Sequence, residues 1–231
     1  MTVDAVRKKG RGSRAQGNIP RMEDLVEILR KRIVEHELPP GSKLRESVLT
    51  AEFNVSRPRV REAFSVLEDR GLIERIPNRG AVVTRLEVEE VFALFEVREV
   101  LEALAVRLAT EKTTPDTWED MVERFGKPIE EAMERGDLDF YVDCVTEFRQ
   151  RAIVAANNPI LAAQLDGLYD RTKVLIRRLV LVPGRALEGM RQHQEVLQAM
   201  RDGNAVLAEQ LKRKNIRSSR ESFCSYQKYL L

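Results

Sequence analysis

Residues 43–68 read KLRESVLTAEFNVSRPRVREAFSVLE, and this stretch decides the fold of the N-terminal part of the chain. It predicts two helices joined by a tight turn at Asn54-Val55. Ser56 offers its hydroxyl as the N-cap of the second helix, and Pro58 is tolerated because early helical N–H groups lack intrahelical partners. Apolar residues recur at helical spacing in both helices: Val48, Leu49, Ala51 and Phe53 in the first, and Val60, Ala63, Phe64 and Leu67 in the second.

The other face of the second helix begins with three cations, Arg57, Arg59 and Arg61. In a helix-turn-helix, residues at the start of the second helix reach base edges. The planar fork of arginine gives paired donors that suit guanine edges and phosphates. The stretch therefore predicts a DNA-binding unit. The alternative interpretation for each arginine is a solvated surface charge.

A hairpin is predicted directly after the second helix. Gly71-Leu72 closes that helix, and residues 73–76 and 81–84 are expected to form two strands around the turn Pro77-Asn78-Arg79-Gly80. Such a hairpin is a wing that can lie over DNA beside the recognition helix. Arg79 at its tip can enter a narrow minor groove, where the negative potential is greatest.

Charge is distributed unevenly along the 231 residues. Residues 1–85 hold 18 Lys or Arg against 12 Asp or Glu, and the remainder holds 21 against 25. A basic part joined to a mildly acidic part suits a nucleic-acid-binding domain with a regulatory domain, although a random fluctuation would look the same. Residues 1–20 predict a disordered basic arm, which is either a source of phosphate contacts or a plain solvated tail.

The sequence as a whole predicts two domains. Residues 21–85 are expected to form a winged helix-turn-helix domain, and residues 86–231 an all-helical domain. The first domain is expected to start with a helix over 23–37, ended by Pro39-Pro40-Gly41. A long helix follows from Val88, and Pro128 is expected to interrupt a later one. Further helices are predicted at 115–135, 138–156, 160–181, 185–201 and 204–225, which together give an antiparallel α-helical bundle in a mainly α fold.

Other classes of protein find little support in the sequence. No apolar run is long enough to span a bilayer, and no secretory signal begins the chain. Cys144 and Cys224 lack metal-motif spacing and are expected to be reduced thiols in a cytoplasmic protein, with a disulfide as the alternative. With His36 and His193 as the two histidines, and no phosphate-cradling glycine loop, we expect neither an enzyme nor a cofactor.

Taken together, these residues resemble the GntR superfamily of bacterial transcriptional regulators, within it the FadR-like branch with an FCD effector domain. The resemblance covers residues 22–220. Its N-terminal motifs are LPPGSKLRE (38–46), VSRPRVREA (55–63) and LEDRGLI (67–73). Its C-terminal motifs are LFEVR (94–98) with Leu101-Glu102, ANNP (156–159), and His193 ahead of Val196-Leu197.

The resemblance implies roles for residues of the N-terminal domain. Arg45, Arg57 and Arg61 occupy positions where relatives contact DNA, and Gly80 lies where the wing tip approaches the groove. The usual Thr before Pro is absent here, so Arg59 is expected to add a contact that relatives lack. The predicted DNA-binding set is Arg45, Ser56, Arg57, Arg59, Arg61, Arg79 and Gly80.

The sequence departs from the family pattern inside the helical domain. Many FCD domains hold a divalent metal through an Asp and three His, and the corresponding positions here are Val145, Arg149, His193 and Asn215. Valine cannot ligate a metal, and arginine cannot lose its proton. We therefore expect no zinc or similar ion at this set, which disfavours a metal-dependent sensor.

Helical spacing places Arg98, Arg149, His193 and Asn215 on inward-facing stripes. A buried arginine needs a carboxylate or phosphate. We hypothesise that Arg149 takes the place of the metal and binds a small organic anion, with Arg98, His193 and Asn215 as further donors. The alternative is that Arg149 pairs with an internal acid, Glu102 or Glu195, and binds no ligand.

The expected function is that of a ligand-responsive transcriptional regulator, more commonly a repressor in this family. A homodimer would read a pseudo-palindromic operator in double-stranded DNA, since one winged module reads only a half-site. The effector would act by binding one arrangement of the two modules more tightly. An effector-independent DNA binder, in which the helical domain only dimerises, is the remaining alternative.

Overall fold

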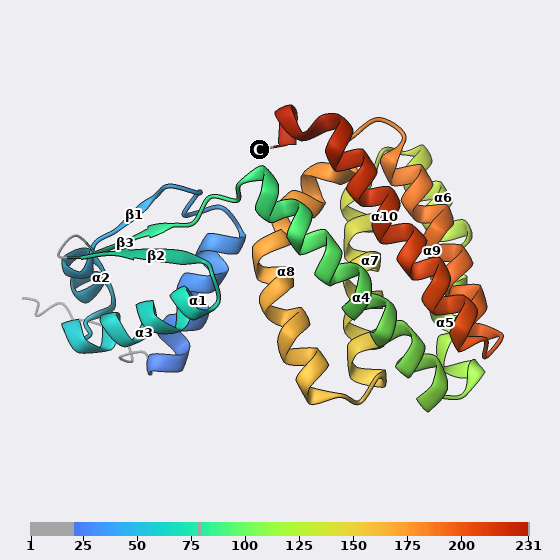
Figure 1. Cartoon of the computed structure of the whole chain (residues 1–231), viewed down its shortest axis with the longest axis horizontal. Helices are drawn as coiled ribbons and strands as arrows, with labels where there is room; N and C mark the ends of the chain where they lie inside the picture. The colour runs from blue at the N-terminus through green and yellow to red at the C-terminus, as the bar shows by residue number, and fades with distance from the viewer. Residues whose placement is uncertain (1–20, 78–79, 231) are drawn as a thin grey trace, which may run out of the picture.

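The computed structural model describes residues 21–77 and 80–230, so the predicted basic arm and Arg79 lie outside the described residues. The elements form two groups that lie side by side (Figure 1). The N-terminal group comprises α1 (Met22–Val34), β1 (Lys43–Leu44), α2 (Glu46–Phe53), α3 (Arg57–Asp69), β2 (Ile73–Ile76) and β3 (Gly80–Val83). The C-terminal group comprises α4 (Val88–Lys112), η1 (Pro115–Trp118), α5 (Glu119–Arg124), α6 (Lys127–Glu134), α7 (Leu138–Ala155), α8 (Pro159–Val180), α9 (Arg185–Arg201) and α10 (Ala205–Leu230).

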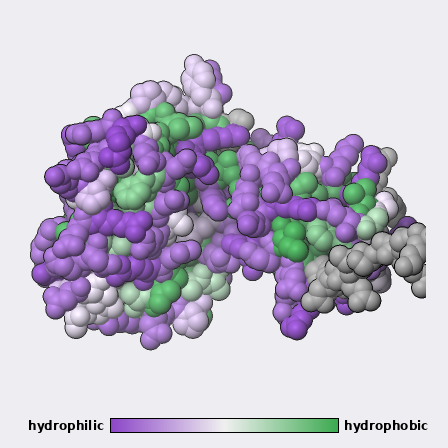
Figure 2. Space-filling view, turned by 180° about the vertical axis from the view of Figure 1, so that it is seen from behind, coloured by the Kyte–Doolittle hydropathy of each residue, from purple (hydrophilic) through white to green (hydrophobic). Residues whose placement is uncertain are grey.

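The mainly α fold with a winged helix-turn-helix and a helical bundle is thereby confirmed. Each group has its own buried apolar cluster, and no residue of the N-terminal cluster recurs in those of the described bundle. In Figure 2 the join between the groups is mainly hydrophilic, with hydrophobic residues gathered in patches on either side. Within the described ranges, no helix has the length and apolar character needed to cross a membrane.

The helix-turn-helix forms because α3 buries one continuous apolar face. The predicted stripe of α3 is confirmed, since its buried residues are Val60, Ala63, Phe64 and Leu67. The turn before α3 places Asn54 in the left-handed region (φ 53°), a conformation that asparagine tolerates. The predicted stripe of α2 is wrong: only Leu49 is buried there, and Val48 is 53% exposed. Phe53, four residues after Leu49, is partly buried and packs against the same cluster, whereas Val48 and Ala51 remain on the exposed side of this eight-residue helix.

The wing is a three-stranded antiparallel sheet in the order β1-β3-β2. The two hairpin strands were predicted, although β3 starts one residue earlier than expected. β1 was not predicted, because its two residues gain a strand conformation only by pairing with Ala81 and Val82. Gly80 has φ +92°, and a Cβ atom at this position would lie 2.3 Å from the Leu44 carbonyl oxygen. The close approach of β1 therefore requires glycine here.

The end of α1 comes earlier than the sequence predicts. The helix stops at Val34 rather than at residue 37, because His36 adopts a positive φ of 61°. The Leu38 amide then donates a hydrogen bond back to the Arg32 carbonyl, which closes the helix end. The helix has therefore ended before the chain reaches Pro39, so the two prolines follow the end of α1 and do not cause it.

The bundle follows the predicted order of helices. The segment predicted as one helix over 115–135 is divided into η1, α5 and α6, and Pro128 lies in the first turn of α6, as expected for an interruption. α10 continues to residue 230 rather than 225. α4 packs mainly against α10 and also contacts α7 and α8. Figure 1 shows α8 and the start of α4 next to the N-terminal group, with α5 and α6 on the far side.

Candidate DNA-binding surface and effector cavity

The start of α3 carries the predicted recognition residues at the end of the molecule farthest from the bundle (Figure 1). Arg57 is the first residue of α3 and is exposed, and Arg45 is the exposed N-cap residue of α2. Ser56 is the N-cap of α3 as predicted, but its side chain makes no capping hydrogen bond. The predicted role of its hydroxyl as a cap is therefore wrong, and Ser56 caps α3 through its backbone conformation.

Arg61 forms an ion pair that the sequence did not predict. Its guanidinium lies 2.9 Å from a carboxylate oxygen of Glu46, the first residue of α2. The Arg61 side chain is 63% exposed, so this pair contributes little to stability. The contact is made by Arg61 Nε, so a DNA phosphate or base would compete with Glu46 for this guanidinium. Arg59 is half-buried, so Arg45 and Arg57 are the more accessible cations.

The four residues predicted to bind the effector line one cavity of about 880 Å³, which is bounded mainly by helices of the bundle. They come from four helices, with Arg98 on α4, Arg149 on α7, His193 on α9 and Asn215 on α10. Three of them are fully buried, and Arg149 is nearly so. The inward direction predicted from helical spacing is therefore confirmed, whereas their role in ligand binding stays a prediction.

Glu102 on α4 lies behind the cavity wall, and three cations surround it. Its carboxylate oxygens lie 2.8 Å from the Arg98 guanidinium, 2.9 Å from Lys212 Nζ and 3.6 Å from Arg149 Nε. One of the two acids weighed as partners of Arg149 is thus present, while Glu195 pairs with Lys214 instead. The 3.6 Å contact is long, and Arg149 Nε is a buried atom without a hydrogen-bond partner among the described residues.

Sequence reasoning missed two buried cations of this region, Arg185 and Lys212. Lys212 lies four residues after Ala208 and four before Ile216, both buried, so its position on an apolar stripe was a usable signal. Arg185 opens α9 after Gly184 and donates a hydrogen bond of 2.6 Å to Ser219. Together with Arg98 and Arg149 they place four positive charges near Glu102, and Arg185 also lies 3.9 Å from the more exposed Glu188.

The pKa shifts follow from burial and from this excess of positive charge. Burial would raise the pKa of Glu102, but Lys212, Arg98 and Arg149 outweigh it and hold that pKa well below its usual range. Burial lowers the pKa of Lys212 to about 8, although Glu102 opposes the shift. Burial raises the pKa of Tyr141 to about 12. At neutral pH Glu102 is therefore ionised, Lys212 is mainly protonated, and Tyr141 keeps its proton.

His193 presents an acceptor that has no partner. Its Nδ1 lies 2.7 Å from the Gly189 carbonyl oxygen, a contact that requires a proton on Nδ1. Burial, followed by the charges of Lys212 and Arg149, lowers the pKa of His193 well below 6.5, so the ring is neutral and Nε2 carries a lone pair. Nε2 is buried without a hydrogen-bond partner in the part of the chain that the structure describes. A ligand hydroxyl could donate to it.

The metal site of related FCD domains does not fit these residues. Val145 has no donor atom, and Arg149 brings a positive charge to the place where a cation would sit. Residues 21–77 and 80–230 hold no group of three or more His, Cys, Asp or Glu side chains that could bind a metal ion. The absence of a metal stays a prediction, and elemental analysis of the purified protein tests it.

The neutral state of His193 predicts a loss of stability in mild acid. Below the unfolded-state pKa of about 6.5, His193 takes up a proton in the unfolded chain but not in the folded protein. The free energy of unfolding therefore decreases as the pH is lowered. The loss approaches about 1.4 kcal/mol for each pH unit until the folded pKa is reached. Urea unfolding at pH 7.5 and 5.5 checks this, and His193→Gln should lose less stability than the wild type. Equal losses would contradict the assignment.

Comparison with known proteins agrees with the two-part structure. Residues 21–83 match the family model described as bacterial regulatory proteins, gntR family, and residues 93–218 match the FCD domain model. The chain is 30% identical to the HTH-type transcriptional repressor RspR of Escherichia coli over 192 residues, which cover 81% of this chain and 82% of that protein. It is 29% identical to the HTH-type transcriptional regulator LutR of Bacillus subtilis, over 75% and 87% of the two chains.

A solved structure shares the fold. The structure of E. coli McbR/YncC superposes with a TM-score of 0.68 at 21% identity, covering 90% of this chain and 98% of that one. The winged helix-turn-helix, the helical bundle and both family matches lead to one conclusion: the chain belongs to the GntR family of bacterial regulatory proteins, carries an FCD domain, and is a transcriptional regulator.

Proposed function

We propose that this protein is a dimeric repressor that binds a pseudo-palindromic operator and releases it when a small organic anion enters the bundle cavity. The observation that carries the proposal is the cavity itself, whose four predicted residues meet beside an excess of buried positive charge. Buried charged side chains with perturbed pKa values often mark binding sites. The repressor named among the relatives supports the sign of regulation.

The DNA-binding half of the proposal rests on the winged module. Arg45 and Arg57 are exposed at the starts of α2 and α3, where side chains of a helix-turn-helix reach DNA. Ser56, Arg59, Arg61, Arg79 and Gly80 complete the proposed contact set. Two modules are needed to read two half-sites.

A surface on α4 supports the proposed dimer. Val97 and Val100 are three residues apart on one face of this helix, and both are about half-exposed. Exposed apolar residues that share a helix face are typical of subunit contacts. Light scattering of the purified protein tests the dimer, and a monomeric mass at micromolar concentration would contradict it.

The cavity also limits the chemistry of the effector. Arg149 and Arg185 suit carboxylate or phosphate oxygens, because a guanidinium donates two parallel hydrogen bonds. His193 Nε2 suits a hydroxyl donor. A hydroxycarboxylate or a sugar acid would satisfy both, and the cavity volume of about 880 Å³ accommodates a ligand of that size.

The effector proposal predicts that Arg149→Ala abolishes ligand binding. A thermal-shift screen of hydroxycarboxylates and sugar acids, with citrate among them, should find one that raises the melting temperature of the wild type. Loss of a buried charge-assisted contact should weaken that ligand by roughly 2–5 kcal/mol. Arg191→Ala is the matched control, because Arg191 is exposed on α9.

Two results would decide against the effector proposal. Equal ligand affinity in the wild type and Arg149→Ala would remove the arginine anchor. A wild type that binds operator DNA but responds to none of the anions would favour the effector-independent alternative, in which Arg149 only completes the cluster around Glu102. Stoichiometric zinc, nickel or manganese in the purified protein would favour a metal-dependent sensor.

A further inference from the structure

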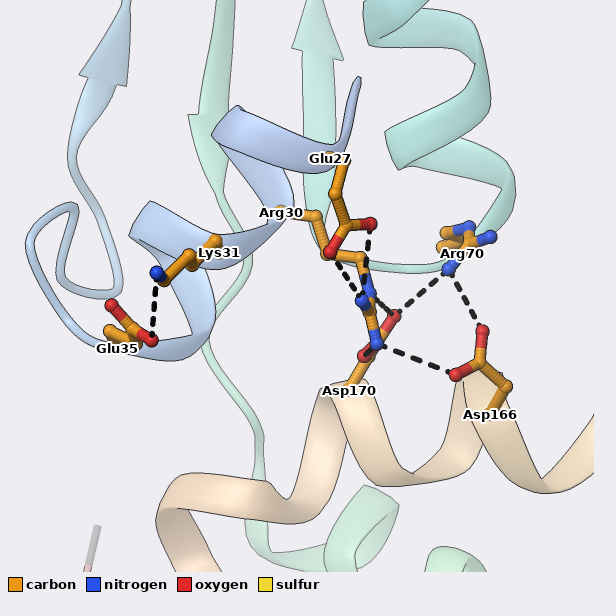
Figure 3. Close-up of polar contacts among 7 residues, drawn as sticks. All are labelled: Glu27, Arg30, Lys31, Glu35, Arg70, Asp166 and Asp170. Carbon is orange, nitrogen blue, oxygen red and sulfur yellow. Dashed lines mark hydrogen bonds and ion pairs between the residues drawn. The ribbon is translucent and has the colours of Figure 1, made fainter. Parts of the chain in front are cut away.

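Four charged residues join the winged domain to the bundle (Figure 3). Arg30 of α1 holds Asp170 of α8 through two hydrogen bonds of 2.7 and 2.5 Å. Arg70, the C-cap residue of α3, lies 3.1 Å from Asp166 and 3.2 Å from Asp170. We call these four residues the interdomain latch. It ties both the first helix and the recognition helix of the winged domain to α8.

Burial makes Asp170 the central residue of the latch. Its side chain is only 2% exposed, whereas that of Asp166 is 53% exposed. The hydrogen bond from Arg30 to Asp170 raises the pKa of Arg30, although partial burial opposes the shift. A buried carboxylate that loses its partners is left desolvated and uncompensated. The latch therefore favours one orientation of the winged domain over others that would separate Asp170 from the two arginines.

The latch adjoins the effector cavity. Tyr169 precedes Asp170 on α8, and its ring lies 5.3 Å from the guanidinium carbon of Arg149. Tyr169, Asp166 and Asp170 all line the cavity. One turn of α8 thus contacts both the proposed anchor of the effector and the arginines of the winged domain.

Helix α1 also forms part of the cavity wall. Residues of this helix and its end that line the cavity are Glu27, Arg30, Lys31, Val34 and Glu35. The cavity is therefore bounded by residues of both domains, and its shape depends on how α1 lies against α8. A ligand near α1 would meet the cations Arg30 and Lys31. Arg30 already contacts Asp170 and Glu27, and Lys31 lies 4.0 Å from Glu35.

We propose that the effector site is shared by the two domains and that the interdomain latch is the element through which an anion controls DNA binding. This inference rests on the proposed function. An anion in the cavity offers Arg30 an alternative partner, repels Asp166 and Asp170, and draws Arg149 away from Tyr169. The latched arrangement is then the ligand-free, operator-binding one, and the effector favours an unlatched arrangement.

The latch can be tested without knowing the effector. Full-length Asp170→Asn should bind DNA from upstream of its own coding region on the order of tenfold more weakly than the wild type in the absence of ligand, within the usual range of coupling between sites. Asp166→Asn should shift the affinity in the same direction by less. Asp139→Asn is the control, because Asp139 forms an exposed pair with Arg177 between two helices of the bundle and contacts no residue of the latch.

A double-mutant cycle separates the latch from general destabilisation. If Arg30 and Asp170 act through each other, Arg30→Gln with Asp170→Asn should weaken operator binding by clearly less than the sum of the two single changes, although Asp170 also pairs with Arg70. Independent effects that add would overturn the latch. Asp166→Asn covers the case in which Asp170→Asn fails to fold, because the exposed Asp166 contributes little to stability.

Failure of the latch and failure of the proposed function give different results. If the wild type binds the operator and both folded aspartate variants bind it equally well, the latch is wrong while the repressor proposal stands. A second outcome is that the wild type binds the DNA and an anion, and that Arg149→Ala no longer binds this anion. If neither aspartate variant then changes operator affinity, the effector acts by another route. A wild type that binds no DNA refutes the proposed function and the latch with it.

Discussion

Glu102→Gln is expected to lower the free energy of unfolding by about 3–5 kcal/mol, the usual cost of removing one partner from a buried ion pair. The change leaves Arg98, Lys212 and Arg149 without a negative charge beside them, and two of these side chains are almost inaccessible to water. A loss of that size is a large fraction of the stability of a typical domain. Urea denaturation at pH 7 measures it.

The same variant should change the response to acid and to anions. Because the pKa of folded Glu102 is depressed, its contribution is present above the unfolded pKa of 4.5 and declines as pH falls below that value. The variant lacks this decline. An added anion such as citrate should raise its melting temperature more than that of the wild type. Glu195→Gln is the control, since Glu195 forms an exposed pair. A Glu102→Gln variant as stable as this control would contradict the role of Glu102.

Arg57→Ala is expected to weaken specific operator binding by roughly 1–3 kcal/mol if the side chain reads a base. Arg57 is the first residue of α3 and is exposed, and it has no ion pair with residues 21–77 or 80–230 that it would have to give up before it reaches DNA. Arg61→Ala should have a smaller effect, because Glu46 competes with DNA for the Arg61 guanidinium. Fluorescence anisotropy with a labelled operator fragment at fixed salt measures both changes.

The control for the arginine variants is Arg135→Ala, which removes one positive charge from the exposed end of α6 in the bundle. Specific and non-specific DNA should be titrated side by side. A base contact lowers the affinity for the operator alone, whereas a phosphate contact lowers both affinities and reduces the salt dependence. Operator affinity that does not change in Arg57→Ala would remove this residue from the proposed contacts.

Local signals account for most of the fold that could be predicted. The stripe of α3, the left-handed turn at Asn54 and the proline at the start of α6 follow from the side chains and backbone preferences of a few neighbouring residues. The errors have nonlocal causes. β1 exists only by pairing with β3, and Val48 of α2 stays exposed because no described element packs over that side of the helix.

The candidate effector site was predictable only in part. Helical spacing placed Arg98, Arg149, His193 and Asn215 inward, and that direction is a property of single helices. The partnership of Glu102 with three cations from α4, α7 and α10 depends on how those helices pack. Which of two acids would meet Arg149 could not be decided without that packing.

By itself, the sequence determined the order of the long helices and of the two hairpin strands, the family and the inward direction of the polar residues, because periodicity and turn chemistry act over a few residues. The tertiary structure decided that Glu102 is the shared partner of three cations beside the cavity and that Arg30 and Arg70 meet Asp166 and Asp170. Arg30 is 140 residues away from Asp170 in the chain. Only the packing of two domains brings such charges together, since no local preference relates residues at that separation.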